Sequence, residues 1–438
     1  MKILVLDAEK TGLPFAMRCL AAKHEVRYWV SPELGSGPSL IGRGMVPRVA
    51  EWKPSMRWAD LIVMTDNTKY SSDLRPFFRQ GFPIMGATEE AAELELDRSV
   101  GQLCFEHHGI DILPYAEFTN WDKAIAHVLA SKSEFVSKPW GGHSDKNLSY
   151  VPNTRADLVA RMDRWKKDGL KCSMVLQEKI GDGYEMGVSA WFGPGGFDSN
   201  IEEDWEHKKL LVGDLGPTTG EMGTVCRYVK KSKLFEEVLA PLEDELKRRK
   251  FVGPVNINCL IDKDGKPWPL EFTCRLGWPA TNLELALHKG DPANWMLDLI
   301  EGRNTLKASS DICVGAVMAM GDFPWNRDPP GRNDGWPIRG LTPETLPHCY
   351  LTSVMMGEGW VNKGTKVVKE EGIVTAGSYV LVVTGTGKTV QEAQASCYEV
   401  VDEIKWSPHQ TYRTDIGNRL EKCLSDLQDM GYATGMEF

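Results

Sequence analysis

Gly253-Pro254-Val255-Asn256-Ile257-Asn258 and Pro269-Leu270-Glu271-Phe272-Thr273-Cys274-Arg275 are the most informative strings in this sequence. A turn signal separates them, and we predict a two-stranded hairpin. Since side chains alternate along a strand, Glu271, Thr273 and Arg275 share one face. Asn256 and Asn258 share one face of the partner strand. Oxygen ligands of this kind suit Mg²⁺, and Glu271 can bridge two such ions. Arg275 can offset the charge on a transferred phosphoryl group. A hairpin with one solvated polar face is the commoner explanation of these residues alone.

A second string places a lysine at the end of a predicted strand and directly before a glycine loop: Phe135-Val136-Ser137-Lys138-Pro139-Trp140-Gly141-Gly142-His143-Ser144-Asp145-Lys146. Lys138 supplies a fixed positive charge, and Gly141 and Gly142 let the backbone approach closely. With Lys146 they suit a flap over ATP phosphates. Taken alone, a glycine turn with surface lysines explains the pattern more simply.

The third string predicts a strand, a turn and a second strand: Val175-Leu176-Gln177-Glu178-Lys179-Ile180-Gly181-Asp182-Gly183-Tyr184-Glu185. Its extended backbone at 177–179 can offer an N–H and a C=O to an adenine edge. Glu185 can accept hydrogen bonds from ribose hydroxyls. An ordinary hairpin is again the simpler explanation of this string by itself.

The order and spacing of the three strings together resemble the ATP-grasp superfamily. The stretch His207-Lys208-Lys209-Leu210-Leu211-Val212-Gly213-Asp214-Leu215-Gly216-Pro217-Thr218-Thr219-Gly220-Glu221-Met222-Gly223 resembles the H-K…G-D-x-G-P-N-T-G-G-M-G motif of the glycinamide ribonucleotide synthetase (phosphoribosylamine–glycine ligase) family. Glu271–Pro279 is similar to that family's E-F-N-C-R-F-G-D-P. Three tail segments also match, namely Cys313–Gly321, Thr375–Gly377 and Tyr412–Gly417. The likeness covers nearly the whole chain.

The resemblance implies a ligase that uses ATP and Mg²⁺ (or Mn²⁺) to join a carboxylate to an amine through an acyl-phosphate. It implies nucleotide-binding residues, namely Arg98, Lys138, Gly141, Gly142, Lys146, Gln177, Glu178, Lys179, Ile180 and Glu185. It also implies metal ligands (Glu271, Asn258 and Thr273) and catalytic residues (Arg275, Lys208 and Asp214). The substrates are small molecules: glycine or another small amino acid as the carboxylate, and an amine, either free or nucleotide-borne.

Several family motifs are altered on the substrate side. The first strand-to-helix turn, Glu9-Lys10-Thr11-Gly12-Leu13, lacks the family's G-G-R-E-H string, and Thr65–Tyr70 replaces its G-P-E-x-P-L. Thr273 replaces an asparagine, which weakens one metal ligand, and Asn258 compensates in our interpretation. Gly277-Trp278-Pro279-Ala280 loses two acids. We therefore expect an amine other than phosphoribosylamine. True phosphoribosylamine–glycine ligation of purine synthesis is the alternative, and a non-catalytic nucleotide-binding relative is the second alternative.

The predicted elements divide the chain into three parts. We expect residues 1–90 to form an N-terminal α/β substrate domain with a doubly wound parallel sheet. Residues 91–305 form the ATP-grasp domain, with a flexible lobe at about 120–192 that holds three antiparallel strands (135–139, 174–179 and 184–192). Residues 306–438 form a C-terminal α+β domain. The pattern predicts single helices over 121–130, 155–167, 234–249, 390–404 and 416–430.

Composition limits the remaining possibilities. Of 438 residues 42% are hydrophobic and 26% are charged, which is typical of a soluble protein with several lobes. We expect a cytoplasmic location, because the N-terminus begins with a strand pattern and no apolar run reaches membrane-spanning length. A formal net charge of −10 argues against general nucleic-acid binding. Ten scattered cysteines predict no disulfide framework, and we expect a monomer or homodimer.

Overall fold

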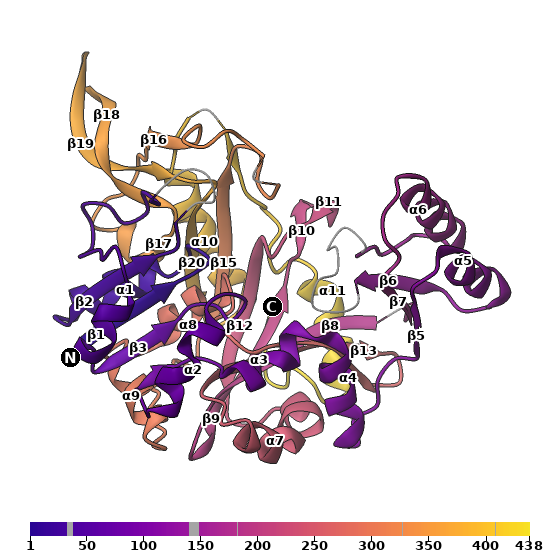
Figure 1. The fold of residues 1–438 in the computed structure, drawn as a ribbon. Helices are drawn as coiled ribbons and strands as arrows, with labels where there is room; N and C mark the ends of the chain where they lie inside the picture. The colour runs from indigo at the N-terminus through magenta and orange to yellow at the C-terminus, as the bar shows by residue number, and fades with distance from the viewer. Residues whose placement is uncertain (33–37, 140–148, 182, 326, 408) are drawn as a thin grey trace.

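The computed structural model describes residues 1–32, 38–139, 149–181, 183–325, 327–407 and 409–438 (Figure 1). The chain begins with a four-stranded parallel sheet of order β2-β1-β3-β4. Its elements are β1 (Lys2–Asp7), α1 (Leu13–Ala21), β2 (Glu25–Val30), a 3₁₀ helix (Lys53–Trp58), β3 (Leu61–Met64), α2 (Ser71–Arg79) and β4 (Ile84–Met85). This is the predicted doubly wound arrangement. The carboxyl ends of its strands are where such sheets bind ligands.

A nine-stranded sheet in the described part of the chain forms the centre of the molecule. Its order is β14-β13-β8-β9-β12-β15-β20-β17, and β21 pairs with β15. The strands are β8 (Gly183–Gly193), β9 (Gly196–Glu206), β12 (Gly223–Val229), β13 (Gly253–Asp262), β14 (Pro267–Thr273), β15 (Ile312–Met320), β17 (Cys349–Leu351), β20 (Tyr379–Gly387) and β21 (Gln410–Thr411). The helices of this part are α7 (Glu243–Arg248), α8 (Ala280–Leu287), α9 (Asn294–Ile300), α10 (Val390–Glu403) and α11 (Leu420–Asp429). One hydrophobic core joins this sheet to the N-terminal one.

A small lobe stands apart from this body, on the right in Figure 1. Its sheet has the order β5-β7-β6, with β5 (Tyr115–Phe118), β6 (Phe135–Pro139) and β7 (Met174–Glu178). Helices α5 (Trp121–Ala130) and α6 (Arg155–Lys167) pack on it around a separate core that includes Trp121 and Trp165. The prediction that 184–192 joins this lobe was wrong: β8 pairs with β9 and β13, because its run of buried residues fits a central strand.

Helices α3 (Glu89–Leu96) and α4 (Arg98–His107) connect the N-terminal sheet to the lobe. A short hairpin, β10 (Lys209–Leu211) and β11 (Leu215–Thr218), follows β9. A three-stranded sheet, β16 (Asp334–Pro337), β18 (Val354–Lys363) and β19 (Lys366–Ala376), projects beyond the large sheet, and a 3₁₀ helix spans Leu346–His348.

Two predicted helices differ in the structure. The expected helix over 234–249 is a π-helix (Phe235–Leu239), a 3₁₀ turn (Ala240–Leu242) and α7. Pro241 lies at the break, where proline removes a backbone donor and clashes with the preceding turn. The expected helix over 416–430 starts only at Leu420.

Candidate active site

The predicted hairpin forms, and its register brings the polar residues face to face. Asn258 pairs with Glu271, and Asn256 pairs with Thr273. Glu271 Oε2 lies 3.2 Å from Arg98 Nη2, and its Oε1 lies 3.6 Å from Lys208 Nζ. Burial alone would raise the pKa of Glu271, but Lys208, Arg98 and Lys138 together lower it to about 2. Glu271 is therefore an ionised carboxylate surrounded by cations.

Lys208 lies at the centre of this cluster. Its Nζ is 2.9 Å from Glu206 Oε2, 3.2 Å from Glu185 Oε1 and 3.6 Å from Glu271. Burial acts to lower the pKa of Lys208, but the three carboxylates outweigh it and raise the pKa well above its usual value. Lys208 thus keeps its charge beside the predicted phosphoryl-transfer position.

Asn258 has the free oxygen that a metal site needs. Its Nδ2 donates to Glu206 Oε2 at 3.0 Å, while its buried Oδ1 has no hydrogen-bond partner. Within the described ranges, no three histidine, cysteine or acidic side chains are grouped to hold an ion unaided. Glu271 and Asn258 therefore fit an ion that also takes phosphate oxygens, which is the usual manner of Mg²⁺. Thr273, paired with Asn256, is the remaining candidate ligand.

The lobe supplies the nucleotide side of the site. Lys138 Nζ donates to Gln177 Oε1 at 2.7 Å, across neighbouring strands β6 and β7. Burial and the nearby Arg98 lower the pKa of Lys138 to about 7. Its charge is therefore not fixed, contrary to the simple expectation. The predicted flap residues, Gly141, Gly142 and Lys146, lie outside the described residues.

Two backbone N–H groups of the predicted adenine-binding strand already donate hydrogen bonds within the chain. The N–H of Glu178 donates to Pro114 O at 2.8 Å, and the N–H of Lys179 donates to Glu134 O at 2.9 Å. The Lys179 side chain pairs with Glu134. The N–H groups of Glu178 and Lys179 are therefore already engaged within the chain.

Arg275 is held by two acids that the sequence motifs did not single out. Its Nε lies 3.2 Å from Glu95 Oε1 and 3.9 Å from Asp66 Oδ2. Burial opposes the charge, but Glu95 and Asp66 raise the pKa of Arg275. Asp66 belongs to the segment that replaces a family motif, so the N-terminal sheet helps to position Arg275.

Asp214 is separate from this cluster. It lies in the β10–β11 turn at a positive φ of 56°, and its Oδ1 accepts from Arg413 Nη1 at 2.7 Å. Arg413 is buried and also pairs with Asp415. The structure therefore shows Asp214 holding the turn to the C-terminal part, and it does not bring Asp214 to Glu271.

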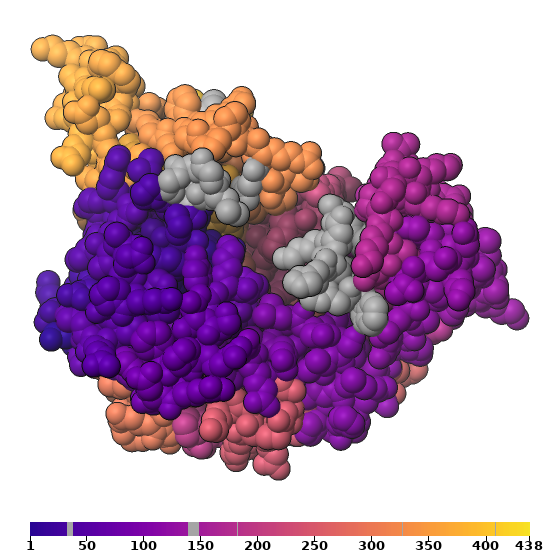
Figure 2. Space-filling model, in the orientation of Figure 1, coloured from indigo at the N-terminus to yellow at the C-terminus, as the bar shows by residue number. Residues whose placement is uncertain are grey.

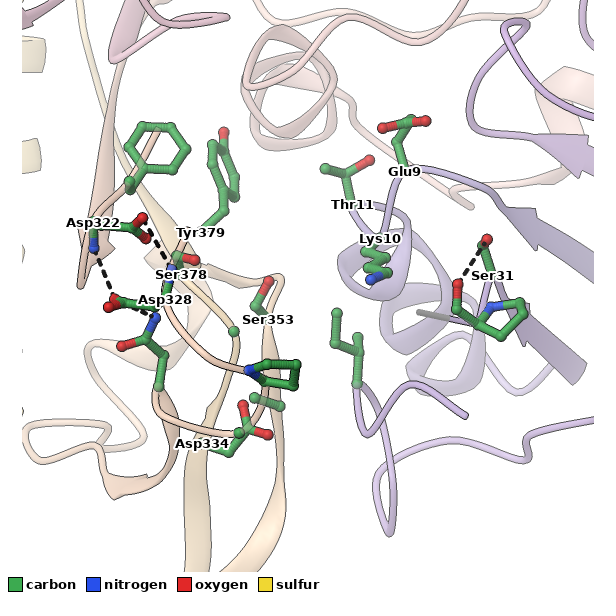
Figure 3. A pocket seen from close by; sticks show the side chains of 18 of the residues that line it. Glu9, Lys10, Thr11, Ser31, Asp322, Asp328, Asp334, Ser353, Ser378 and Tyr379 are labelled. Carbon is green, nitrogen blue, oxygen red and sulfur yellow. Dashed lines mark hydrogen bonds between the residues drawn. The ribbon is translucent and has the colours of Figure 1, made fainter. Parts of the chain in front are cut away.

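A cleft of about 820 Å³ opens between the N-terminal sheet and the C-terminal part (Figures 2 and 3). On the N-terminal side lie Glu9, Lys10 and Thr11, from the altered first turn. Tyr379 and Asp322 face them across the cleft. Glu9 Oε1 pairs with Lys69 Nζ at 2.8 Å, so the turn presents a neutralised ion pair instead of an anion-binding glycine string.

A second cavity, of about 140 Å³, lies beside the Glu271 cluster. It is lined by Glu271, Lys208 and Arg275, and by Trp278, whose Nε1 donates to Thr65 O at 3.4 Å. Four further buried acids line it, namely Glu202, Asp204, Glu221 and Glu284. The sequence interpretation missed all four.

Comparison with known proteins identifies the class. Residues 98–281 match the family model described as phosphoribosylglycinamide synthetase, ATP-grasp (A) domain, and residues 313–419 match that of its C domain. The solved phosphoribosylamine–glycine ligase from Thermotoga maritima covers 95% of this chain and 100% of its own, with a TM-score of 0.70 at 19% identity. Biotin carboxylase from Campylobacter jejuni aligns over 98% of this chain and 97% of its own, with a TM-score of 0.61 at 12% identity. The chain has the predicted ATP-grasp fold and is an ATP-grasp ligase.

More particularly, the chain resembles the phosphoribosylglycinamide synthetase family, whose two domain models together match about two thirds of it. It is 29% identical over 355 residues to phosphoribosylamine–glycine ligase of Halalkalibacterium halodurans, covering 78% of each chain. It is 29% identical over 362 residues to that of Vibrio vulnificus, covering 78% of this chain and 79% of the relative.

The relatives are ligases, so the non-catalytic alternative is set aside. ATP-grasp enzymes use ATP with a divalent metal ion and act on small molecules. Across the described residues, no helix has the length and apolar character needed to cross a bilayer.

Proposed function

We propose that this chain is an ADP-forming ligase that activates the carboxylate of an amino acid and joins it to an amine. The observation that carries the proposal is the convergence of Glu271, Lys208 and Arg275 on one cavity. An ionised carboxylate beside two retained cations is suited to phosphoryl transfer, which depends mainly on positioning and on charge stabilisation.

Each residue of the site has a separate role in the proposed reaction. Glu271, Asn258 and Thr273 would hold magnesium, which when bound offsets charge on the ATP phosphates. Lys138 binds the phosphates from the lobe. Arg275, held by Glu95 and Asp66, stabilises charge as a substrate carboxylate oxygen attacks the γ-phosphorus and ADP leaves. The amine nitrogen then attacks the acyl carbon, and phosphate and a proton leave.

Glycine and phosphoribosylamine are the first candidate pair, because the relatives are named phosphoribosylamine–glycine ligase over 78% of this chain. A second candidate is glycine, or another small amino acid, with a different amine. The Glu9–Lys69 ion pair favours it, since Lys69 is already paired with Glu9 and the turn offers no net positive charge to a phosphate dianion. Trp278 offers a flat apolar face suited to stacking on a ring.

A competition assay tests both candidates. The pure protein receives ATP, magnesium, glycine, phosphoribosylamine and a mixture of nucleotide-borne amines, and the product is identified by mass. Formation of glycinamide ribonucleotide at the rate of ADP release would establish the first candidate. A product of different mass would establish the second. No ADP release with any amino acid and amine would refute the proposed function.

A further inference from the structure

The smaller cavity is lined by more carboxyl groups than phosphoryl transfer requires. The carboxyl groups that line it beyond Glu271 and Glu206 are almost fully buried, with exposed fractions of 2% for Glu202, 2% for Asp204, 6% for Glu221 and 7% for Glu284. They come from β9, from the segment before β12 and from α8. Acids of this kind are almost never fully buried unless they are paired.

No cation in the described part of the chain forms an ion pair with these four acids. Lys208 is engaged by Glu206, Glu185 and Glu271, and Arg275 by Glu95 and Asp66. Asn256 Nδ2 donates to Asp204 Oδ2 at 2.6 Å, and a hydrogen bond joins Glu202 to Glu284. One oxygen of each of three acids still has no hydrogen-bond partner, namely Glu202 Oε1, Asp204 Oδ1 and Glu221 Oε1. Leaving such groups buried and unsatisfied is costly, so they point to a ligand that donates hydrogen bonds and carries positive charge.

The acids on β9 form a row that leads away from the phosphoryl-transfer position. Glu202, Asp204 and Glu206 alternate along the strand, so consecutive members are about 7 Å apart. Glu206, which pairs with Lys208, marks the near end of the row. Opposite Asp204 lies Gly187, where a Cβ atom would collide with the carboxylate. The glycine thus leaves room for the Asp204 side chain at the middle of the row.

We propose that this cavity binds the ammonium groups of the amino acid whose carboxylate is activated, and that this amino acid is an α,ω-diamino acid of the ornithine or lysine type. The inference rests on the proposed ligase function. The carboxylate of such a molecule meets Lys208 and Arg275, and its far ammonium group reaches toward Glu202. Glycine has its only ammonium group next to the carboxylate and leaves the far acids without a cationic partner.

Cavity size and electrostatics support this assignment. A cavity of about 140 Å³ is comparable to the engineered cavity of about 150 Å³ that holds benzene, and thus admits a short aliphatic chain. Burial raises the pKa of all four carboxyl groups, and neighbouring carboxylates add to the rise for Glu202, Asp204 and Glu221. A buried ammonium ligand reverses this effect, because an opposite charge at short range favours the ionised carboxylate.

The test measures activation without knowledge of the amine. The protein is incubated with MgATP, hydroxylamine and one amino acid, and the hydroxamate formed by trapping of the acyl-phosphate is quantified. The series is glycine, norleucine, ornithine and lysine, in which norleucine matches lysine in length but lacks the second ammonium group. We expect kcat/KM for lysine or ornithine to exceed that for norleucine by about tenfold or more, the factor typical of a charged hydrogen bond.

Matched variants identify the residues responsible. Glu202→Gln and Glu284→Gln keep the shape of the side chains and remove the charge, and we expect each to lower the lysine-to-norleucine ratio about tenfold. Glu106→Gln, an exposed position on α4 outside the cavity, should leave the ratio unchanged. Melting temperatures show whether each variant is folded, and calorimetric binding of lysine provides a second measurement.

The outcomes separate the inference from the proposed function. Equal or better activation of glycine or norleucine would overturn the inference and leave the ligase function intact. Hydroxamate formation from lysine that is insensitive to both glutamine variants would also overturn it. Lysine binding that weakens in Glu202→Gln, with no hydroxamate from any amino acid, would support the cavity assignment and refute the ligase function. Incorporation of a simple diamine as the amine, with glycine as the carboxylate, would contradict the inference.

Discussion

ATP affinity should depend on pH through Lys138. Burial, and then the repulsion from Arg98 and Lys208, lower the pKa of this ammonium group to about 7, although Glu271 and Glu185 oppose the shift. The ATP phosphates favour the protonated form. Above pH 7 the free protein must therefore take up a proton when ATP binds, and affinity falls as pH rises.

The magnitude follows from proton linkage. One proton taken up on binding changes the dissociation constant tenfold per pH unit, equivalent to about 1.4 kcal/mol. If the bound phosphates keep Lys138 charged throughout, Kd for MgATP should rise about a hundredfold between pH 6 and pH 9. Most of the change falls above pH 7, because below the lowered pKa the lysine is already charged.

Isothermal titration calorimetry at pH 6, 7, 8 and 9 measures this dependence. Lys138→Arg is the matched control, since its guanidinium stays charged throughout and can still donate to Gln177. We expect a nearly flat profile above pH 7 in that variant, which also corrects for titration of ATP itself. A wild-type Kd that is constant between pH 7 and pH 9, or a wild-type slope equal to that of the variant, would refute the reasoning.

Two further predictions concern the metal and the nucleotide. Glu271→Ala should lower ATP turnover by at least about 10²-fold with an unchanged circular dichroism spectrum, because it removes the carboxylate proposed to hold the metal, at the edge of the sheet, and not a core side chain. Glu106→Ala is the control, and near-normal turnover of Glu271→Ala would contradict the assignment. MgATP at a hundredfold excess over Kd should stabilise the protein by about 2.7 kcal/mol and raise its melting temperature. NADH should not, and stabilisation by NADH alone would favour a dehydrogenase.

Capping residues and turn signals in the sequence predicted the helices and the hairpin whose ends these residues determine. Helix α6 begins at its predicted residue because Thr154 and Asp157 form a capping box, and α5 because the Asn120 side chain accepts from the N–H of Lys123. The β13–β14 hairpin follows its turn signal. The partners of β8 could not be predicted in this way, because strand pairing is set by residues far apart in the chain.

The clustering of Glu271 with Lys208 and Arg98 was expected only through the family resemblance, since the three residues come from separate parts of the chain. The structure adds Glu95 and Asp66 as the acids that position Arg275. Neither acid lies in a sequence motif that predicts an ion pair with Arg275. Tertiary packing of the N-terminal sheet on the large sheet brings them there.

The acid row on β9 shows why the second cavity was missed, although its pattern is present in the sequence. Asn200-Ile201-Glu202-Glu203-Asp204-Trp205-Glu206 contains alternating acids, but charged residues are depleted in strands, and such a run normally predicts a solvated segment. Pairing of β9 with β8 on one side and β12 on the other makes it a central strand. Glu203, on the opposite face, is neutralised by Arg227 at 2.8 Å. Glu202 and Asp204 have no cationic partner in the described residues, and the chain gives them only hydrogen bonds with Glu284 and Asn256. A local rule that the described chain compensates only in part is expected where a ligand supplies the rest.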